Sequence, residues 1–328
     1  MISYPEVLED LRRHNIRPTR GDYFDFNGQP LEHEYSRFFD FCQEYLDRGD
    51  LGYDVRPSRF FYNSSSRTNG CAYTTDQFGI VEIWRGSITW IYDYFLPREG
   101  RFNDPNFQIY RTLSNRLQIS PGYYLFQMST LFFLYHETGH LIQQGGPIGE
   151  NIEYMARICT GDTVRTQHMR ELDADAFGCH CLAMHVVMFA EKKAGIANSV
   201  DPQLLQDAAA LSLAAIFIFF LRISDARPTI YLREKCHPHP MVRLSYCIRF
   251  LLDNLAENTT IQLDQPQILK RAIQISEHVM LDADINIVRE YMLSLGAQLN
   301  AVEAYINEII EGTKAYPQLC VNRLAKLK

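Results

Sequence analysis

The sequence lacks several features that would assign the protein to a broad class. It has no run of Lys and Arg, and its 32 basic against 39 acidic residues give a net charge of -7. This charge excludes a general electrostatic attraction to nucleic acid or to an anionic membrane surface. Internal repeats and low-complexity tracts are also missing. A hydrophobic content of 46% is typical of a globular chain rather than a disordered one.

Long apolar segments are scarce as well. Residues 1–15 contain acidic side chains where a signal peptide needs an apolar stretch, so we expect a protein that is not secreted. The most apolar run, residues 208–221, is shorter than the ~20 residues that a membrane-spanning helix needs. We therefore predict a buried core helix there, no membrane span and a cytoplasmic location.

The eight cysteines include no C-x-x-C pair. Cys179 and Cys181 lie two residues apart on a predicted helix, so they point to different faces and cannot share a metal ion. Without a secretion signal, we expect the thiols to be reduced.

The order of the sequence patterns predicts an α+β fold, with a small sheet early in the chain and helices late. Residues 77–95 are dense in β-branched and aromatic side chains. This predicts two strands that meet near Arg85 as a hairpin, or one strand that runs into a helix. A Gly-Gly-Pro segment at 145–147 ends the first of the later helices. These helices are predicted at 122–144, 166–193, 202–223, 238–254 and from 266 to the C-terminus.

The most informative segment is H-E-T-G-H at residues 136–140. His136 and His140 are four apart on a predicted helix, so both imidazoles project from one face and can bind one Zn²⁺. Glu137 beside them can take a proton from the attacking water as a general base. The apolar neighbours indicate a buried helix, in which histidines and a glutamate without partners would be costly. The pattern therefore favours metal ligands over core histidines.

A catalytic zinc site needs a third protein ligand. Glu171 is favoured because it shares a helix face with Ala174 and Gly178, whose small side chains let another helix approach closely. Asp175 lies one turn further and can accept the free N–H of a ligating histidine, whereas His180 points the opposite way. The candidates for the third ligand are Glu150, Glu153, His168, Glu171, Asp173 and Asp175.

H-E-x-x-H followed by E-x-x-x-D resembles the gluzincin metallopeptidases. Residues 171–178, ELDADAFG, resemble the corresponding segment of the HtpX and CAAX-prenyl-protease type. Residues 69–72 and 79–86 resemble two strands of that group, and 237–243 resembles its H-P-x-x-x-x-R segment.

The sequence also departs from that pattern. Gly70 and Cys71 replace Ala and Phe, Ala176 replaces Arg, and the membrane helices of those relatives are missing. A soluble branch is implied, similar in size and motif layout to the phage-exclusion peptidases of the Lit type.

The resemblance implies a zincin-like fold, in which an edge strand lies over a mainly helical metallopeptidase core. It divides the chain into an N-terminal region (1–68), the catalytic core (69–255) and a C-terminal helical region (256–328). The edge strand would pair with an extended peptide through main-chain hydrogen bonds. The residues at this position are Gly70, Cys71, Ala72 and Tyr73, although the turn-rich residues before them also fit a plain loop.

The downstream segment adds candidate residues. His237 would donate a hydrogen bond to the oxyanion of the intermediate, and Arg243 would pair with Glu171 or Asp175. His239 is the rival of His237, and the spacing to Arg243 favours His237. Tyr231 and Tyr246 are alternative donors, and His-Pro-His-Pro could also be only a rigid turn before a helix.

Together these features predict a zinc-dependent endopeptidase that holds one Zn²⁺ and hydrolyses a polypeptide, with one specific cytosolic protein as a conceivable substrate. One alternative is a latent or inactive zinc-binding domain that acts through protein interaction. The other is an interaction protein whose histidines are structural. The oligomeric state is left open.

Overall fold

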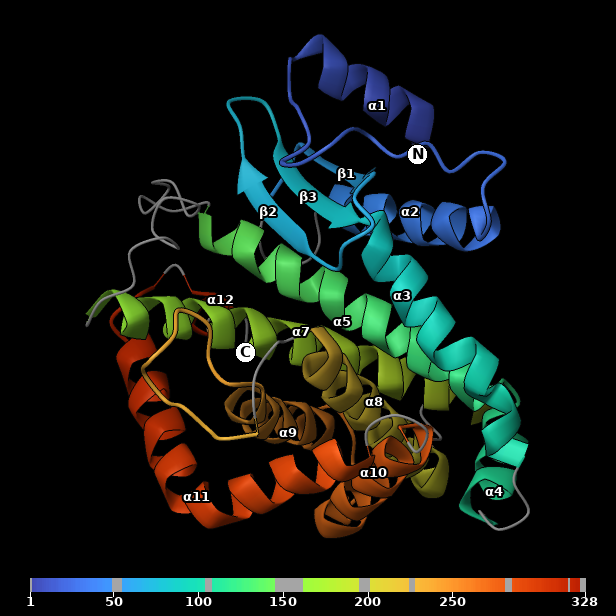
Figure 1. Cartoon of the computed structure of the whole chain (residues 1–328), viewed down its shortest axis with the longest axis vertical. Helices are drawn as coiled ribbons and strands as arrows, with labels where there is room; N and C mark the ends of the chain where they lie inside the picture. Colours follow the sequence, from blue (N-terminus) through green and yellow to red (C-terminus); the bar gives the residue numbers. More distant parts are fainter. Residues whose placement is uncertain are drawn as a thin grey trace.

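The fold is mainly helical, with one small sheet near the N-terminus, which confirms the α+β class (Figure 1). The structure, a computed structural model, describes residues 2–48, 55–103, 108–144, 162–194, 201–223, 228–280, 285–317 and 319–324. The elements in its first half are α1 (Tyr4–Arg13), α2 (Glu32–Asp47), β1 (Ser58–Asn63), β2 (Gly70–Thr74), β3 (Gly79–Trp84), α3 (Arg85–Phe95), the 3-10 helix η1 (Leu96–Asn103), α4 (Gln108–Leu117) and α5 (Pro121–Gln144). The later elements are α7 (Asp162–Ala194), α8 (Pro202–Ile223), α9 (Pro240–Glu257), α10 (Gln265–Val279), α11 (Ile285–Thr313) and α12 (Cys320–Leu324).

The N-terminal third contains helices that the sequence analysis did not predict. α1 begins at a capping box in which the Ser3 N–H donates to Glu6 Oε2 at 2.7 Å. Its apolar face, which includes Val7 and Leu11, is buried. For residues 77–95 the second alternative is correct, because β3 runs directly into α3.

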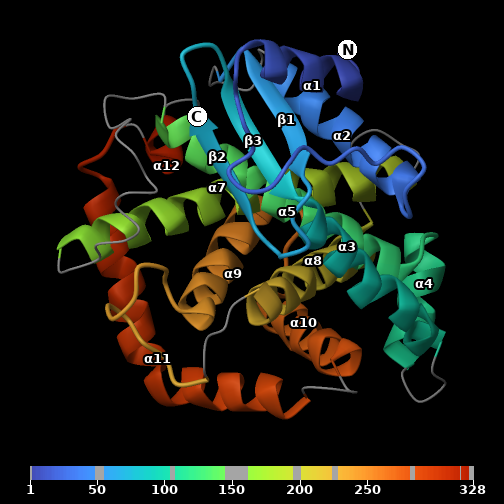
Figure 2. The ribbon, with the colours of Figure 1, turned by 45° about the horizontal axis from the view of Figure 1, so that its top comes forward.

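The three strands form a mixed sheet in the order β1-β3-β2, with β3 parallel to β1 and antiparallel to β2. All of β3 is buried, as a central strand requires. β2 lies at the edge and packs against α5, and Figure 2 shows the strands lying over that helix. The predicted boundary after residue 68 therefore falls between two strands of one sheet.

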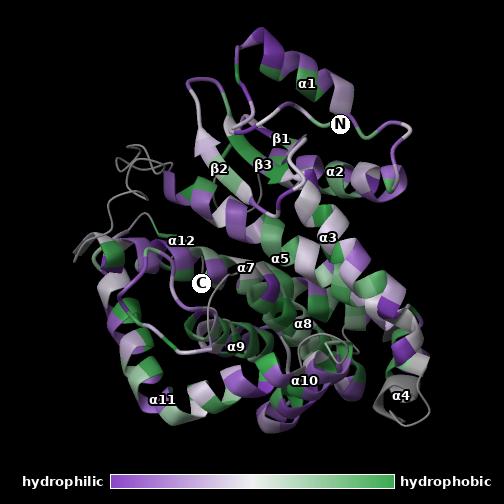
Figure 3. Ribbon diagram, in the orientation of Figure 1, coloured by the Kyte–Doolittle hydropathy of each residue, from purple (hydrophilic) through white to green (hydrophobic). Residues whose placement is uncertain are grey.

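α5 lies at the centre of the molecule and packs against the sheet, α7 and α8. The predicted core helix at 208–221 is part of α8, which is predominantly hydrophobic (Figure 3). Two helical segments, Thr163–Lys192 and Pro202–Arg222, are long and apolar enough to cross a membrane. They are weak evidence for a membrane protein, since 94% of the apolar window in the second is buried inside the fold.

The cysteines only partly follow the expectation of reduced thiols. Cys236 is disulfide-bonded, so the prediction of reduced thiols throughout the chain was wrong. The free thiols are those of Cys42, Cys71, Cys179, Cys181, Cys247 and Cys320.

Small residues let α5 and α7 approach closely. A Cβ atom on Gly139 would lie 2.9 Å from the Ala174 Cα atom, and one on Gly178 would lie 3.1 Å from the Phe132 ring. The face of α7 that carries Ala174 and Gly178 is thus the face against α5. Larger side chains here would push the two helices apart.

Gly139→Ala should destabilise the protein by about 1–3 kcal/mol, because the added methyl group overpacks the α5–α7 contact. The matched control is Gly296→Ala on α11, where a Cβ atom meets no atom within 4 Å. This control should stabilise the helix by about 0.5–1 kcal/mol. Urea unfolding of both variants measures the two effects, and equal stabilities would contradict the proposed tightness of the contact.

Candidate metal centre

Two histidines on α5 and one glutamate on α7 converge inside the molecule. His136 Nε2 lies 3.1 Å from His140 Nε2. The two carboxylate oxygens of Glu171 lie 3.7 Å from these nitrogens, one from each. His136 and Glu171 are buried, and His140 is partly buried. The structure therefore brings together the three residues that the sequence analysis favoured as ligands.

The second nitrogen of each imidazole faces an oxygen atom. His136 Nδ1 lies 2.9 Å from Asp175 Oδ1, and His140 Nδ1 lies 3.2 Å from Gln143 Oε1. In the neutral rings Nδ1 therefore carries the proton and Nε2 keeps its lone pair. Two lone pairs and a carboxylate then face one another, an arrangement that a cation between them would stabilise.

The spacing of the three groups suits a metal ion. Ligand atoms at about 2.0–2.1 Å from a tetrahedral metal are roughly 3.3 Å apart, and the separations here are 3.1 Å and 3.7 Å. Two imidazoles and one carboxylate also leave a fourth position for water or substrate. The cluster could hold a metal ion, and its ligand types are not exclusive to zinc.

The protonation states of Glu171 and His140 suit a metal ion, whereas His136 differs: burial lowers its pKa, but the Asp175 carboxylate outweighs burial and raises it. Burial opposes ionisation of Glu171, but His237, His140 and Arg243 outweigh burial and hold its pKa well below the usual value. Burial and the neighbouring His136 lower the pKa of His140 to about 4. At neutral pH Glu171 is therefore an anion and His140 a neutral base, as metal ligands must be.

Arg243 supports the cluster from α9. Its Nε and Nη2 atoms donate to the two oxygens of Asp175 at 2.8 and 2.6 Å, and its Nη1 atom lies 3.8 Å from Glu171 Oε2. The sequence analysis left Glu171 and Asp175 open as its partner. The bidentate contact is with Asp175, which in turn orients His136.

A second chain of contacts starts at His140 and reaches the C-terminal segment. Gln143 accepts from His140 and donates to Asp173 Oδ2 at 2.7 Å. The same carboxylate accepts the N–H groups of Cys320 and Val321 at 2.9 and 3.0 Å. Asp173, one of the alternative third ligands, is thus occupied in holding α12 against α5 and α7.

Other alternative ligands lie elsewhere. His168 is buried between Tyr305, whose hydroxyl lies 2.6 Å from Nδ1, and the Lys235 carbonyl, 2.7 Å from Nε2. Both of its nitrogens therefore have partners outside the cluster. Glu150 and Glu153 lie outside the described residues, as does the predicted Gly-Gly-Pro segment.

Glu137 follows His136 on α5 and is only 5% exposed. Burial raises its pKa to about 7. Among the residues that the structure describes, no side chain or backbone group forms a hydrogen bond or ion pair with it. A buried carboxyl group in this state can exchange a proton near neutral pH.

The two histidines of His-Pro-His-Pro differ in position. The His237 side chain is 65% exposed, and its Nδ1 atom lies 3.4 Å from Glu171 Oε1. His239 is fully buried and caps α9, where its Nδ1 atom accepts the Met241 N–H at 3.1 Å. His237 therefore borders the cluster, whereas His239 has a structural role.

Tyr231 and Tyr246, the alternative hydrogen-bond donors to the oxyanion, each pack against another aromatic ring. Tyr231 packs edge-on against His239, with 4.8 Å between ring centroids. Tyr246 is buried on α9, where it stacks on Phe250 at 4.4 Å.

The four predicted substrate-strand residues form most of β2 and are partly exposed, so the alternative of a plain loop was wrong.

The sequence analysis missed three glutamines around the cluster. Gln167 donates to Glu171 Oε1 at 3.0 Å, Gln143 contacts His140, and Gln144 donates to the Ala72 carbonyl of β2 at 2.7 Å. Their spacing of three or four residues from the ligands on the same helices was the available signal.

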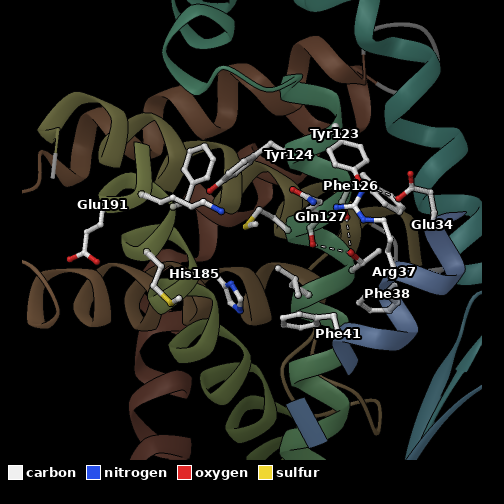
Figure 4. A pocket seen from close by; sticks show the side chains of 16 residues that line it. Glu34, Arg37, Phe38, Phe41, Tyr123, Tyr124, Phe126, Gln127, His185 and Glu191 are labelled. Carbon is white, nitrogen blue, oxygen red and sulfur yellow. Dashed lines mark hydrogen bonds between the residues drawn. The ribbon is translucent and has the colours of Figure 1, made fainter. Parts of the chain in front are cut away.

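A cavity of about 760 Å³ lies away from the cluster, between α2, α5 and α7 (Figure 4). Aromatic and Met side chains dominate its lining, and it includes none of the cluster residues. Among its lining residues are Phe38, Phe41, Tyr124, Phe126, His185, Met188 and Phe189.

No protein-family model, no curated protein and no solved structure matches this chain. The resemblance to gluzincins therefore remains an expectation from the motif residues alone.

His136→Ala and His140→Ala should each lose the metal, because two remaining ligands cannot hold it. Asp175→Asn should weaken metal binding by about 10–100-fold through loss of the imidazole orientation. Elemental analysis after dialysis against zinc, followed by chelator competition, measures both effects. His185→Ala is the control, because His185 lines the cavity away from the cluster, and this variant should keep the full metal content.

Glu171→Gln should also weaken metal binding strongly. Full metal content in this variant, together with loss of metal in Glu150→Gln or Glu153→Gln, would assign the third ligand to another acid.

Proposed function

We propose that the protein is a zinc-dependent endopeptidase with a zincin-like core, in which His136, His140 and Glu171 hold one Zn²⁺. The observation that carries the proposal is the convergence of three lone-pair donors beside Glu137, a buried carboxyl group with no hydrogen-bond partner among the described residues. Two imidazoles, a carboxylate and an adjacent general base are the groups that zinc-dependent hydrolysis of a peptide bond uses.

The bound zinc ion would polarise the peptide carbonyl and acidify the attacking water. Glu137 takes the proton of that water and delivers it to the leaving amine. Burial raises the pKa of Glu137 to about 7, so its surroundings resist a permanent charge on this carboxyl group. Asp175 and Arg243 keep His136 in the orientation that ligation needs.

His237 is the proposed oxyanion donor. Its pKa is raised, chiefly by the neighbouring Glu171 carboxylate. This favours a cationic imidazole, which is a stronger donor than a neutral one. Since Nδ1 lies beside Glu171, Nε2 is the nitrogen available to the substrate.

The proposed substrate is an extended polypeptide that lies along β2. This strand is at the edge of the sheet, over the helix that carries the two histidines. Main-chain pairing to an edge strand tolerates many sequences, so selectivity for one cytosolic protein would depend on other surfaces. A cytoplasmic location remains part of this proposal.

Glu137→Gln should fold, keep its zinc and lose cleavage of labelled casein, because the change removes the base and no ligand. Circular dichroism, metal analysis and a fluorescence digest measure the three properties. Wild-type rates in this variant would exclude the proposed role of Glu137. Full zinc binding without cleavage by the wild type would instead favour the latent or interaction domain.

His237→Ala should leave metal content and KM nearly unchanged and lower kcat by about 10²–10³-fold, since the hydrogen bond is strongest on the developing oxyanion. His239→Ala is the control, because it removes the α9 cap and should cost about 1 kcal/mol of stability. Steady-state kinetics and thermal unfolding separate the two effects. A silent His237→Ala beside a kcat loss in His239→Ala would reverse the assignment.

A further inference from the structure

The backbone of β2 alternates between its partner strand β3 and its open edge, the side with which no other strand of the described residues pairs. Just outside the strand, the Asn69 carbonyl accepts the Trp84 N–H at 3.0 Å, and the Thr75 N–H donates to the Phe78 carbonyl at 2.8 Å. Odd-numbered residues therefore turn their polar backbone groups toward β3. With a period of two residues, Gly70, Ala72 and Thr74 turn theirs toward the open edge.

One of these outward groups already has a partner. Gln144 Nε2 donates to the Ala72 carbonyl oxygen at 2.7 Å. Gln144 lies four residues after His140 and eight after His136, so it continues the ligand-bearing face of α5. The contact therefore joins this face of α5 to the middle of the β2 edge.

A peptide that pairs with β2 needs the same oxygen atom. At an outward residue of an antiparallel pair, the carbonyl accepts one N–H and the N–H donates to one carbonyl of the added strand. The Gln144 amide already donates to the oxygen atom that the incoming N–H would use. Leaving Gln144 in place would cost the peptide a central hydrogen bond of the pairing.

We propose that Gln144 is a removable placeholder on the β2 edge, which an extended peptide displaces as it binds over the metal cluster. This inference rests on the proposed function, and it narrows the substrate class. The residue paired with Ala72 must carry a backbone N–H, so proline or an N-methylated residue is excluded there.

A purely structural role for Gln144 predicts the opposite change in peptide affinity when the side chain is removed. A contact that only holds β2 on α5 would help peptide binding, and its loss would weaken the affinity for the peptide. A placeholder competes with the peptide, and its loss strengthens affinity. The sign of the change therefore separates the two roles.

The test uses the zinc-loaded full chain carrying Glu137→Gln, so that binding is measured without cleavage. The probe is a fluorescein-labelled peptide of alternating threonine and valine between lysines, which favours the extended conformation. Adding Gln144→Ala should lower the Kd, measured by fluorescence anisotropy, by about 2–10-fold, the equivalent of one net hydrogen bond. The probe with alternate residues N-methylated should gain nothing.

Gln127→Ala is the matched control, because it changes the same residue type on α5 at the distant cavity and should leave the Kd unchanged. Gln144→Leu replaces Gln144→Ala if the latter fails to fold, as judged by circular dichroism and zinc content. An unchanged or raised Kd overturns the placeholder. If none of the variants binds the probe, the placeholder role is overturned as well, because an edge freed of the Gln144 side chain should pair with an extended peptide.

Failure of the proposed function gives a different result. If zinc-loaded wild-type protein cleaves no casein while Gln144→Ala tightens peptide binding, the edge is a peptide site without peptidase activity. If the wild type cleaves and Gln144→Ala leaves Kd and KM unchanged, only the placeholder is wrong.

Discussion

The close packing of α5 on α7, with Gly139 against Ala174, is the contact on which the cluster of His136, His140 and Glu171 depends. His136 and His140 project from one of these helices and Glu171 from the other. The 3.7 Å separations of Glu171 from the two imidazoles depend on this close approach of the helices. The small residues thus determine the geometry of polar residues that lie one turn away.

The same packing places three acids in the interior, and each has its own compensation. Glu171 faces the histidines, Asp175 has a bidentate contact with Arg243, and Asp173 accepts two N–H groups of α12 and the Gln143 amide. Uncompensated burial of any of these carboxylates would be expensive. The distribution of partners leaves Glu171 as the acid that faces the two imidazoles.

The sheet and the cluster are connected through α5. β2 lies along this helix, and Gln144 ties its edge to the face that carries the ligands. Binding at the strand and chemistry at the cluster would therefore involve one rigid element. The large aromatic cavity lies on another side of α5 and shares no residue with this connection.

Relations within one helix were predictable from the sequence, because the helical period fixes which side chains share a face. The pairing of His136 with His140, the placement of Glu171 one turn before Asp175, and the α+β order of elements belong to this class. Relations between elements depend on packing, which no local period encodes. Only the tertiary structure placed Asp173 against α12 and His168 against Tyr305. It likewise decided that His239 caps α9 while His237 borders the cluster. The contact of Gln144 with Ala72 also depends on this packing. It also stabilises the early helices, whose burial against the sheet outweighs a composition rich in aromatic residues, glycine and proline.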